Sequence, residues 1–282
     1  MCAWAKFPSR WIKGYEPGEK PADDEIAGGL GQLSWGENKS AGVYASLVLT
    51  ALAVLANEAQ RAAARGNRRP PGVVTASYDA IAVLTNISRS SIAKGLTLLQ
   101  KVGVLHVEKQ GTSNVYELIG ADEDGGWCML PETYLLSGRK HLKRLAFAQE
   151  HARMKTALNA MKLYLLLLAF RENSTSIANI SYEKIQRYAG IRKEEIRAAI
   201  SLLLVNGLCV IVTTEELAYE KSGQRHNRYR ILGFKKGDDQ LADKGLEQAN
   251  LMAETDALKA EEQDADDDDL EDADDDELAK KL

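Results

Sequence analysis

The sequence predicts an α+β fold, mainly helical, in which one structural unit occurs twice. The first observation is a motif, Ser77-Tyr78-(x2)-Ile81-(x5)-Ile87-(x4)-Ile92-(x5)-Leu98-Leu99-(x3)-Gly103, that recurs without a gap 104 residues later, from Ser181 to Gly207. The second is a signature that follows each copy, Asn114-x-Tyr116 in the first and Asn227-x-Tyr229 in the second. Because a repeat this long exceeds the period of solenoid units, we expect a duplicated domain.

The third observation is the distribution of charge along the chain. The 282 residues carry a net charge of -5, and their 45% hydrophobic content is enough for two small cores. From Asp238 onward, 19 acidic residues face four lysines, whereas residues 1–237 hold 32 basic and 22 acidic side chains, a net of +10. A basic body joined to an acidic segment indicates a nucleic-acid partner.

Several functional classes find no support in the sequence. Cys2, Cys128 and Cys209 are scattered without a CxxC pair, so we expect neither a disulfide framework nor a metal site. The phosphate-binding motif GxxxxGK[ST], HExxH and GxSxG are absent, so we expect no enzyme and no cofactor. The longest apolar runs, 47–56 and 163–170, are shorter than a bilayer span, and no signal peptide is recognisable. We therefore expect a cytoplasmic protein that makes no membrane contact.

Five segments follow from the pattern of residues. Residues 1–40 form an aromatic-rich arm, in which Trp4, Phe7 and Trp11 have helix-like spacing and are expected to cover the first domain or a dimer mate. The other segments are the first repeat (41–120), a basic linker with a helix (121–154), the second repeat (155–234) and an acidic tail (235–282). The tail is expected to be disordered. It can be merely solubilising, or it can fold back on the basic body and compete with DNA.

The elements of the first repeat can be placed in order. An apolar stripe from Val48 to Leu55 indicates an opening helix, which an arginine-rich loop and a short β-prone run at 73–75 follow. A second helix begins near Ser77. A third begins near Ser88, which can cap it, and ends at Gly103. Two β-prone runs, 104–107 and 115–118, then form a hairpin. The second repeat has the same order, with nine more residues in its hairpin.

The second and third helices followed by a hairpin are typical of a winged helix. In that fold the third helix of the unit enters the major groove of DNA. In the first copy the groove-facing positions are Ser88, Arg89, Ser90, Ser91 and Lys94. Arg89 can pair with a guanine and Lys94 with phosphate, although a solvated helix face with Ser88 as a cap is the plain alternative. The arginine-rich loop, with Arg65, Arg68 and Arg69, can follow a phosphate backbone or simply be soluble.

The second copy is less basic at the equivalent helix. Arg192, Lys193 and Arg197 suit DNA, whereas Glu194 and Glu195 repel phosphate, so self-association or a protein partner remains an alternative use of this helix. Its hairpin is more basic and is a candidate for phosphate or minor-groove contact through Arg225, His226, Arg228 and Arg230. Alternation along a strand places Arg228 and Arg230 on one face, opposite Tyr229 and Ile231.

The segment Thr85-Asn-Ile-Ser-Arg-Ser-Ser-Ile-x-Lys94-x-Leu-x-Leu-Leu-x-Lys-x-Gly103-Val-Leu resembles the turn and recognition helix of bacterial winged-helix proteins. Two such domains in tandem, over about 41–234, resemble the replication initiators of plasmids and some phages. The resemblance implies binding to double-stranded origin repeats, with Ser88–Lys94 and Arg192–Arg197 in neighbouring major grooves. Glu194 and Glu195 depart from that pattern.

Three functional hypotheses remain open. The first is an origin-binding initiator, and the second is a transcriptional repressor or other regulator. The third is a scaffold that resembles the tandem winged-helix subunits of chromosome-organising ATPases and binds protein instead of DNA. The expected partners are double-stranded DNA, a second copy through the N-terminal arm or the second domain, and a protein partner for the acidic tail.

Overall fold

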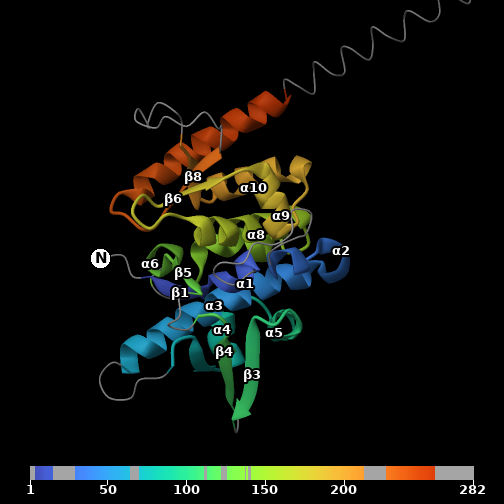
Figure 1. Cartoon of the computed structure of the whole chain (residues 1–282), viewed down its shortest axis with the longest axis vertical. Coiled ribbons are helices and arrows are strands. Elements are labelled where there is room, and N and C mark those ends of the chain that lie inside the picture. The colour runs from blue at the N-terminus through green and yellow to red at the C-terminus, as the bar shows by residue number, and fades with distance from the viewer. Residues whose placement is uncertain are drawn as a thin grey trace, which may run out of the picture.

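The computed structural model describes residues 4–14, 29–63, 70–110, 113–121, 126–136, 138, 141–212 and 227–257. Over these residues the chain is α+β and mainly helical, with three small antiparallel sheets (Figure 1). The predicted fold class is confirmed at this level.

The N-terminal arm is extended at its start and packs onto the linker. Strand β1 (Ala5–Pro8) pairs antiparallel with β5 (Trp127–Leu130), and α1 (Ser9–Lys13), the 3-10 turn η1 (Gly29–Gln32) and α2 (Trp35–Asn38) follow β1. The helix-like spacing of Trp4, Phe7 and Trp11 does not correspond to a single helix: Phe7 lies in β1, which β5 holds extended, and Trp11 lies in α1. Phe7 is fully buried, so the arm does cover its own protein.

The first repeat contains three helices and a three-stranded sheet. Its elements are α3 (Ser40–Ala63), β2 (Val73–Ala76), α4 (Tyr78–Thr85), α5 (Arg89–Lys101), β3 (Leu105–Gln110) and β4 (Ser113–Leu118), with the strand order β2-β4-β3. Ser77 and Ser88 cap α4 and α5, each accepting from a backbone amide three residues on. Gly103 has φ 72°, the left-handed conformation predicted for the end of α5.

The second repeat has the same order of elements. These are α8 (Lys155–Phe170), β6 (Ile177–Ile180), α9 (Tyr182–Ala189), α10 (Lys193–Val205), β7 (Cys209–Ile211) and β8 (Asn227–Ile231), with the strand order β6-β8-β7. Ser181 caps α9 as Ser77 caps α4. The repeat in the sequence is therefore a repeat in the structure.

The linker between the repeats holds several short elements. After β5 come α6 (Glu132–Leu135), the 3-10 turn η2 (Lys143–Leu145) and α7 (Ala146–Glu150). Helix is present there as predicted, but strand β5 was not anticipated. Glu132, although charged, is buried, and it accepts hydrogen bonds from Asn57 and Arg61 of α3. These contacts fasten the linker to the first repeat.

The core is a stack of four helices. Helix α5 packs on α3, α3 on α8, and α8 on α10, and one continuous buried cluster includes residues of both repeats. Two glycines allow close approach: a Cβ on Gly95 would lie 3.0 Å from the Tyr44 carbonyl, and one on Gly42 would lie 3.0 Å from Leu158. Among the described helices, α3 alone is long and apolar enough to cross a membrane, but 72% of its most apolar window is buried inside the protein.

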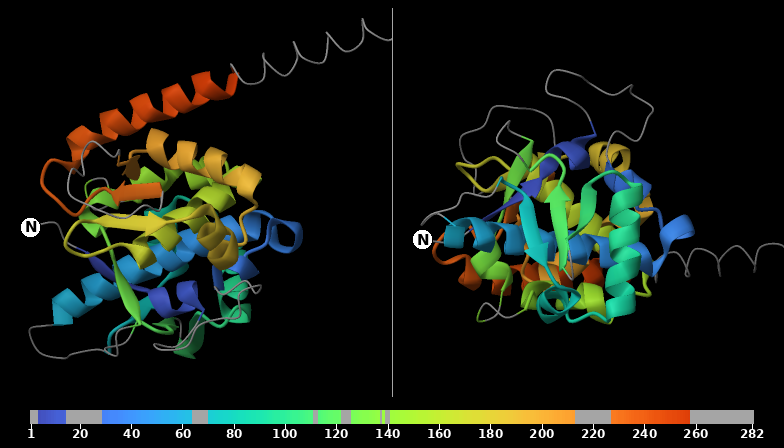
Figure 2. Two further views of the ribbon diagram at one scale, coloured as in Figure 1. Left: turned by 45° about the horizontal axis from the view of Figure 1, so that its top comes forward. Right: turned by 90° about the horizontal axis from the view of Figure 1, so that it is seen from below.

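The chain continues as a long helix after the second repeat. Residues 238–257 are helical and lie across α10 at one end of the molecule, as Figure 1 and the left view of Figure 2 show. The expectation of a disordered acidic tail over 235–282 is therefore wrong for residues 238–257. The physical reason is that Gly245, Ala249 and Met252 recur at helical spacing and face the second repeat. The acidic segment after 257 lies outside the described residues.

Candidate nucleic-acid interface

The N-terminal turn of α5 is an exposed polar surface. The Ser88 hydroxyl accepts from the Ser91 amide at 3.2 Å and lies 2.9 and 3.0 Å from the hydroxyls of Ser90 and Ser91. Ser88, Arg89, Ser90 and Lys94 are exposed, and Ser91 is half-buried. On the opposite side, Ile92, Leu96 and Leu99 are buried, because α5 turns this stripe toward α3. The structure therefore brings the five predicted residues of this helix together on one surface.

Arg89 already has a partner in this surface. Its Nη2 atom lies 2.7 and 2.8 Å from the two carboxylate oxygens of Asp79, and its Nε lies 3.1 Å from Oδ1. The hydrogen bond and the charge of Asp79 raise the pKa of Arg89. Asp79 stands in the first turn of α4, ten residues before Arg89. The sequence did not point to this pair, because its geometry depends on the turn between α4 and α5.

The hairpin β3–β4 stands beside α5. Figure 2 shows it next to α5 when the molecule is seen from below. His106 and Lys109 of β3 are exposed, and β3 is an edge strand that, among the described strands, pairs with β4 alone. A helix end and a hairpin side by side form a surface that can meet a groove and the adjoining backbone of a duplex.

In the second repeat, Glu195 is turned into the protein. Its carboxylate accepts hydrogen bonds from Lys155 and from Asn159 (3.0 Å), both on α8. Arg192 adds contacts at 3.0 Å from Nε and 2.5 Å from Nη2. Burial raises the pKa of Glu195, but these hydrogen bonds outweigh it, so the pKa lies below its ordinary value. Glu195 therefore fixes the start of α10 on α8. Its carboxylate faces Lys155, Asn159 and Arg192 and not the exposed face of the helix, where we expected it to repel phosphate.

The other predicted residues of α10 differ in their surroundings. Arg192 also pairs with exposed Glu194, at 3.3 Å, and Lys193 is exposed. Arg197 donates to the Met252 carbonyl at 3.2 Å and pairs with Asp256 at 2.9 Å, both on helix 238–257. The surface of α10 around Arg197 is therefore covered by another part of the chain.

Helix 238–257 also occupies the edge of the second sheet. The Gln248 side chain accepts from the Ile211 amide at 2.9 Å and donates to the Ile211 carbonyl at 2.8 Å, as a neighbouring strand would. Gly245 lies close to the carbonyls of Leu204 and Cys209, where a Cβ would come within 3.0 and 3.2 Å. In the first repeat no described strand pairs with the equivalent edge, at β3. The two repeats thus share a fold and differ in what their third helices expose.

The remaining predicted residues divide between β8 and undescribed segments. Tyr229 and Ile231 are buried, whereas Arg228 and Arg230 are half-buried on the other face, so the predicted alternation is confirmed. Arg230 has a buried Nε atom that makes no hydrogen bond with any described residue. Five candidates lie outside the described residues, namely Arg65, Arg68, Arg69, Arg225 and His226.

No protein-family model matches this chain, and no curated protein or solved structure matches it. Among the described residues, no group of three or more His, Cys, Asp or Glu side chains is arranged to hold a metal ion.

Proposed function

We propose that the chain is a double-stranded DNA-binding protein built from two tandem winged-helix units, in which the first unit reads sequence. The observation that carries the proposal is the N-terminal turn of α5, with its exposed serines, Arg89 and Lys94 beside the β3–β4 hairpin. Such a turn is the part of a helix that reaches base edges in the major groove. The order helix-strand-helix-helix-strand-strand and the repeated strand order support the winged-helix assignment.

The roles within this surface follow from the chemistry of each side chain. Arg89 carries the donors that pair with guanine O6 and N7, and each such pair discriminates by about 1–3 kcal/mol. Lys94, one turn further along α5, would contact phosphate and contribute affinity that falls with salt. Arg89 would leave Asp79 on binding, which costs little because both side chains are exposed, at 68% and 69%.

The second unit would contribute differently. Helix 238–257 holds Arg197, so in this conformation Arg197 would not reach bases from α10. Contact with phosphate through the β7–β8 hairpin remains the proposed role, with Arg228 as the described candidate. Accordingly, Arg197→Ala should leave DNA affinity unchanged, whereas Arg228→Ala should weaken binding to all duplexes alike and flatten the salt dependence.

For the biological role we propose an origin-binding replication initiator, since the two repeats would supply two DNA-binding modules and the sequence has no recognised catalytic motif. The test is to select preferred sites from random duplexes with the full chain and to locate them near its own gene. A plasmid that carries those sites should replicate only when the protein is supplied. Promoter repression from the same sites without replication would instead establish a transcriptional regulator.

One observation favours a second candidate function, a scaffold that binds protein through its second unit. The α10–β7 surface already accepts a helix, namely 238–257, through Gln248, Met252 and Asp256. If the scaffold function is correct, Arg89→Ala should leave the cellular function intact, whereas the initiator requires Arg89. The same complementation assay therefore separates the two functions.

A further inference from the structure

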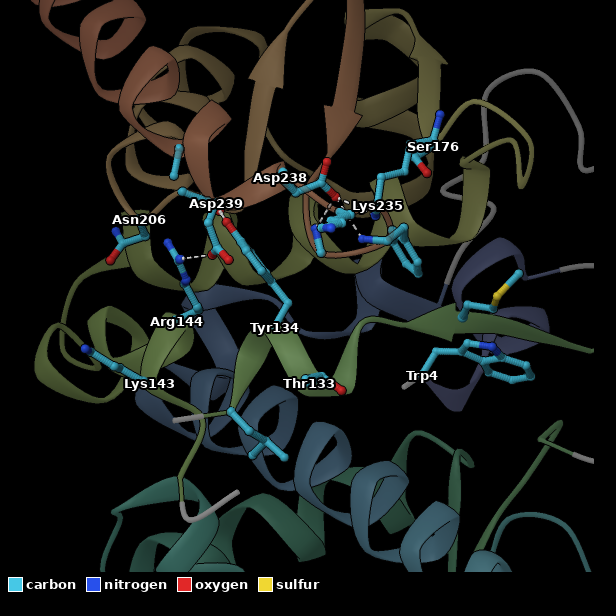
Figure 3. A pocket seen from close by; sticks show the side chains of 18 of the residues that line it. Trp4, Thr133, Tyr134, Lys143, Arg144, Ser176, Asn206, Lys235, Asp238 and Asp239 are labelled. Carbon is cyan, nitrogen blue, oxygen red and sulfur yellow. Dashed lines mark hydrogen bonds and ion pairs between the residues drawn. The ribbon is translucent and has the colours of Figure 1, made fainter. Parts of the chain in front are cut away.

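A large groove of the described structure lies away from α5. Its volume is about 1400 Å³, and it is bounded by Trp4, β5, α6, η2, the end of α10, the loop 233–237 and the first two turns of helix 238–257 (Figure 3). Much of its wall comes from the linker and from residues after β8. It is therefore distinct from the surfaces to which DNA contact was assigned.

The groove carries unneutralised positive charge. Lys143, Lys235 and Lys236 line it, are exposed, and form no ion pair with any described residue. The Asp238 carboxylate is buried and accepts from three backbone amides, those of residues 233, 234 and 235, at 2.7–2.9 Å. These amides of the loop compensate its negative charge. Asp239 is the partner of Arg144.

Two more cations lie over aromatic rings at the same groove. Arg144 lies 4.3 Å from the Tyr134 ring centre, and Arg171 lies 3.8 Å from that of Phe234. A ring face attracts a cation without neutralising it, so Arg171 keeps its charge, whereas Arg144 is also paired with Asp239. Asp243 is the remaining carboxylate of the wall, and with Lys143, Lys235, Lys236 and Arg171 present the groove is positive overall.

The groove is also apolar at its edges. Trp4, Val205 and Leu246 are 39%, 51% and 45% exposed, and they are three of the seven exposed large hydrophobic residues found in the described part of the chain. Trp4 is held flat against Trp127, with ring centres 5.4 Å apart. Exposed apolar groups gathered beside cations favour an acidic segment that also carries isolated apolar side chains.

One segment of this chain has that composition. Residues 264–278 contain eleven acidic side chains, no basic ones, and two leucines, Leu270 and Leu278. Helix 238–257 carries the chain about 30 Å from the groove at 1.5 Å per residue. Nine extended residues, 258–266, cover a similar distance at about 3.3 Å each, so residues from about 267 onward can return to it.

We propose that the groove binds the acidic segment 264–278 of its own chain. Carboxylates of the segment would contact Lys143, Lys235 and Lys236, and Leu270 or Leu278 would lie on Val205 and Leu246. Because the two partners belong to one chain, the effective concentration is high enough for modest contacts to suffice. The acidic segment is thereby held at the linker and kept off α5, in contrast to the expectation that it competes with DNA there. This inference does not depend on the proposed function.

Photo-crosslinking within the full chain tests the proposal. Ala273 is replaced by p-benzoylphenylalanine, the protein is irradiated at micromolar concentration, and the crosslinked peptides are identified by mass spectrometry. Crosslinks are expected to residues 129–144, 205–207 and 233–246. A mixture of isotopically heavy and light protein should give products within one chain only.

Three variants of the labelled chain make the test specific. Lys143→Glu/Lys235→Glu/Lys236→Glu should lower the groove crosslinks at least fivefold, and Leu270→Ser/Leu278→Ser should lower them as well. The matched control, Lys94→Glu/Lys101→Glu/Lys109→Glu, reverses three exposed lysines of the first repeat and should leave them unchanged. The proposal is overturned by crosslinks to α5 or β3, by crosslinks mainly between chains, by a groove yield that the first variant does not change, or by no crosslink at all.

Discussion

Neutralising Asp79 should tighten binding to DNA, because Asp79 holds the side chain that we propose reads guanine. Arg89 makes three contacts of 2.7–3.1 Å with Asp79, and both side chains are about two-thirds exposed. Exposed pairs of this kind contribute about 0.2–1 kcal/mol. In Asp79→Asn, Arg89 no longer has to break this ion pair in order to bind DNA. Affinity for the preferred duplex should therefore rise about 1.5- to 5-fold at a fixed, low salt concentration.

The assay is fluorescence anisotropy with a labelled duplex, and a double-mutant cycle supplies the control. Asp79→Asn in the Arg89→Ala background removes the same negative charge when no arginine is present to be released. The gain should therefore be clearly smaller in that background. An equal gain in both backgrounds, or weaker binding by Asp79→Asn alone, would refute the claim that the ion pair with Asp79 competes with the binding of Arg89 to DNA.

Three further predictions concern stability, measured as the free energy of unfolding in denaturant. Gly95→Ala should destabilise the protein by about 1–3 kcal/mol, since its Cβ would lie 3.0 Å from the Tyr44 carbonyl and force α5 off α3; an unchanged midpoint would show that the helices are less tightly packed. Glu195→Gln should cost about 1–3 kcal/mol at pH 7 through the lost contacts to Lys155 and Arg192. Because the pKa of Glu195 is lowered in the folded protein, its contribution to stability is present above its ordinary pKa and is lost as the pH falls through the folded pKa. A stability difference between Glu195→Gln and the wild type that persists undiminished in acid would contradict this role of Glu195. Burial lowers the pKa of Lys162 to about 8 from 10.5, so wild-type stability should rise between these pH values, where the unfolded chain still binds the proton. Lys162→Met should abolish that rise and add up to about 3 kcal/mol at pH 7; a parallel pH profile in both proteins would be the contrary result.

The elements of the repeats were predictable because their signals are local. Ser77 and Ser88 mark helix starts through their side-chain caps, Gly103 marks an end through its positive φ, and the apolar stripe of α5 identifies the side that faces the core. None of these signals depends on a distant part of the chain. The duplicated pattern repeats all of them except the Ser88 cap, whose counterpart Arg192 makes no side-chain cap.

The features that the sequence did not reveal depend on contacts between distant segments. Strand β1 forms because β5, more than 100 residues later, pairs with it, and the spacing of Trp4, Phe7 and Trp11 gives no sign of that. Helix 238–257 was hidden by its acidic composition, which indicated a tail. Its docking residues include the small side chains of Gly245 and Ala249, which carry little hydrophobic signal.

The candidate site shows the same division. The exposed residues of α5 were predicted from the helix pattern, but the pairing of Arg89 with Asp79 and the inward turn of Glu195 were not. Both depend on how one helix is set against another, which spacing within a single helix does not specify. The covering of Arg197 likewise depends on a segment about 55 residues away.

The most direct test of the central claim is the ratio of dissociation constants for a random duplex and for the preferred duplex, measured with the full chain and with Arg89→Ala. If α5 reads base edges through Arg89, the variant should lower this ratio by about 5- to 150-fold, the equivalent of 1–3 kcal/mol, while random-duplex affinity changes much less. An unchanged ratio, or no binding to any duplex at low salt, would contradict the claim that the first repeat is a sequence reader.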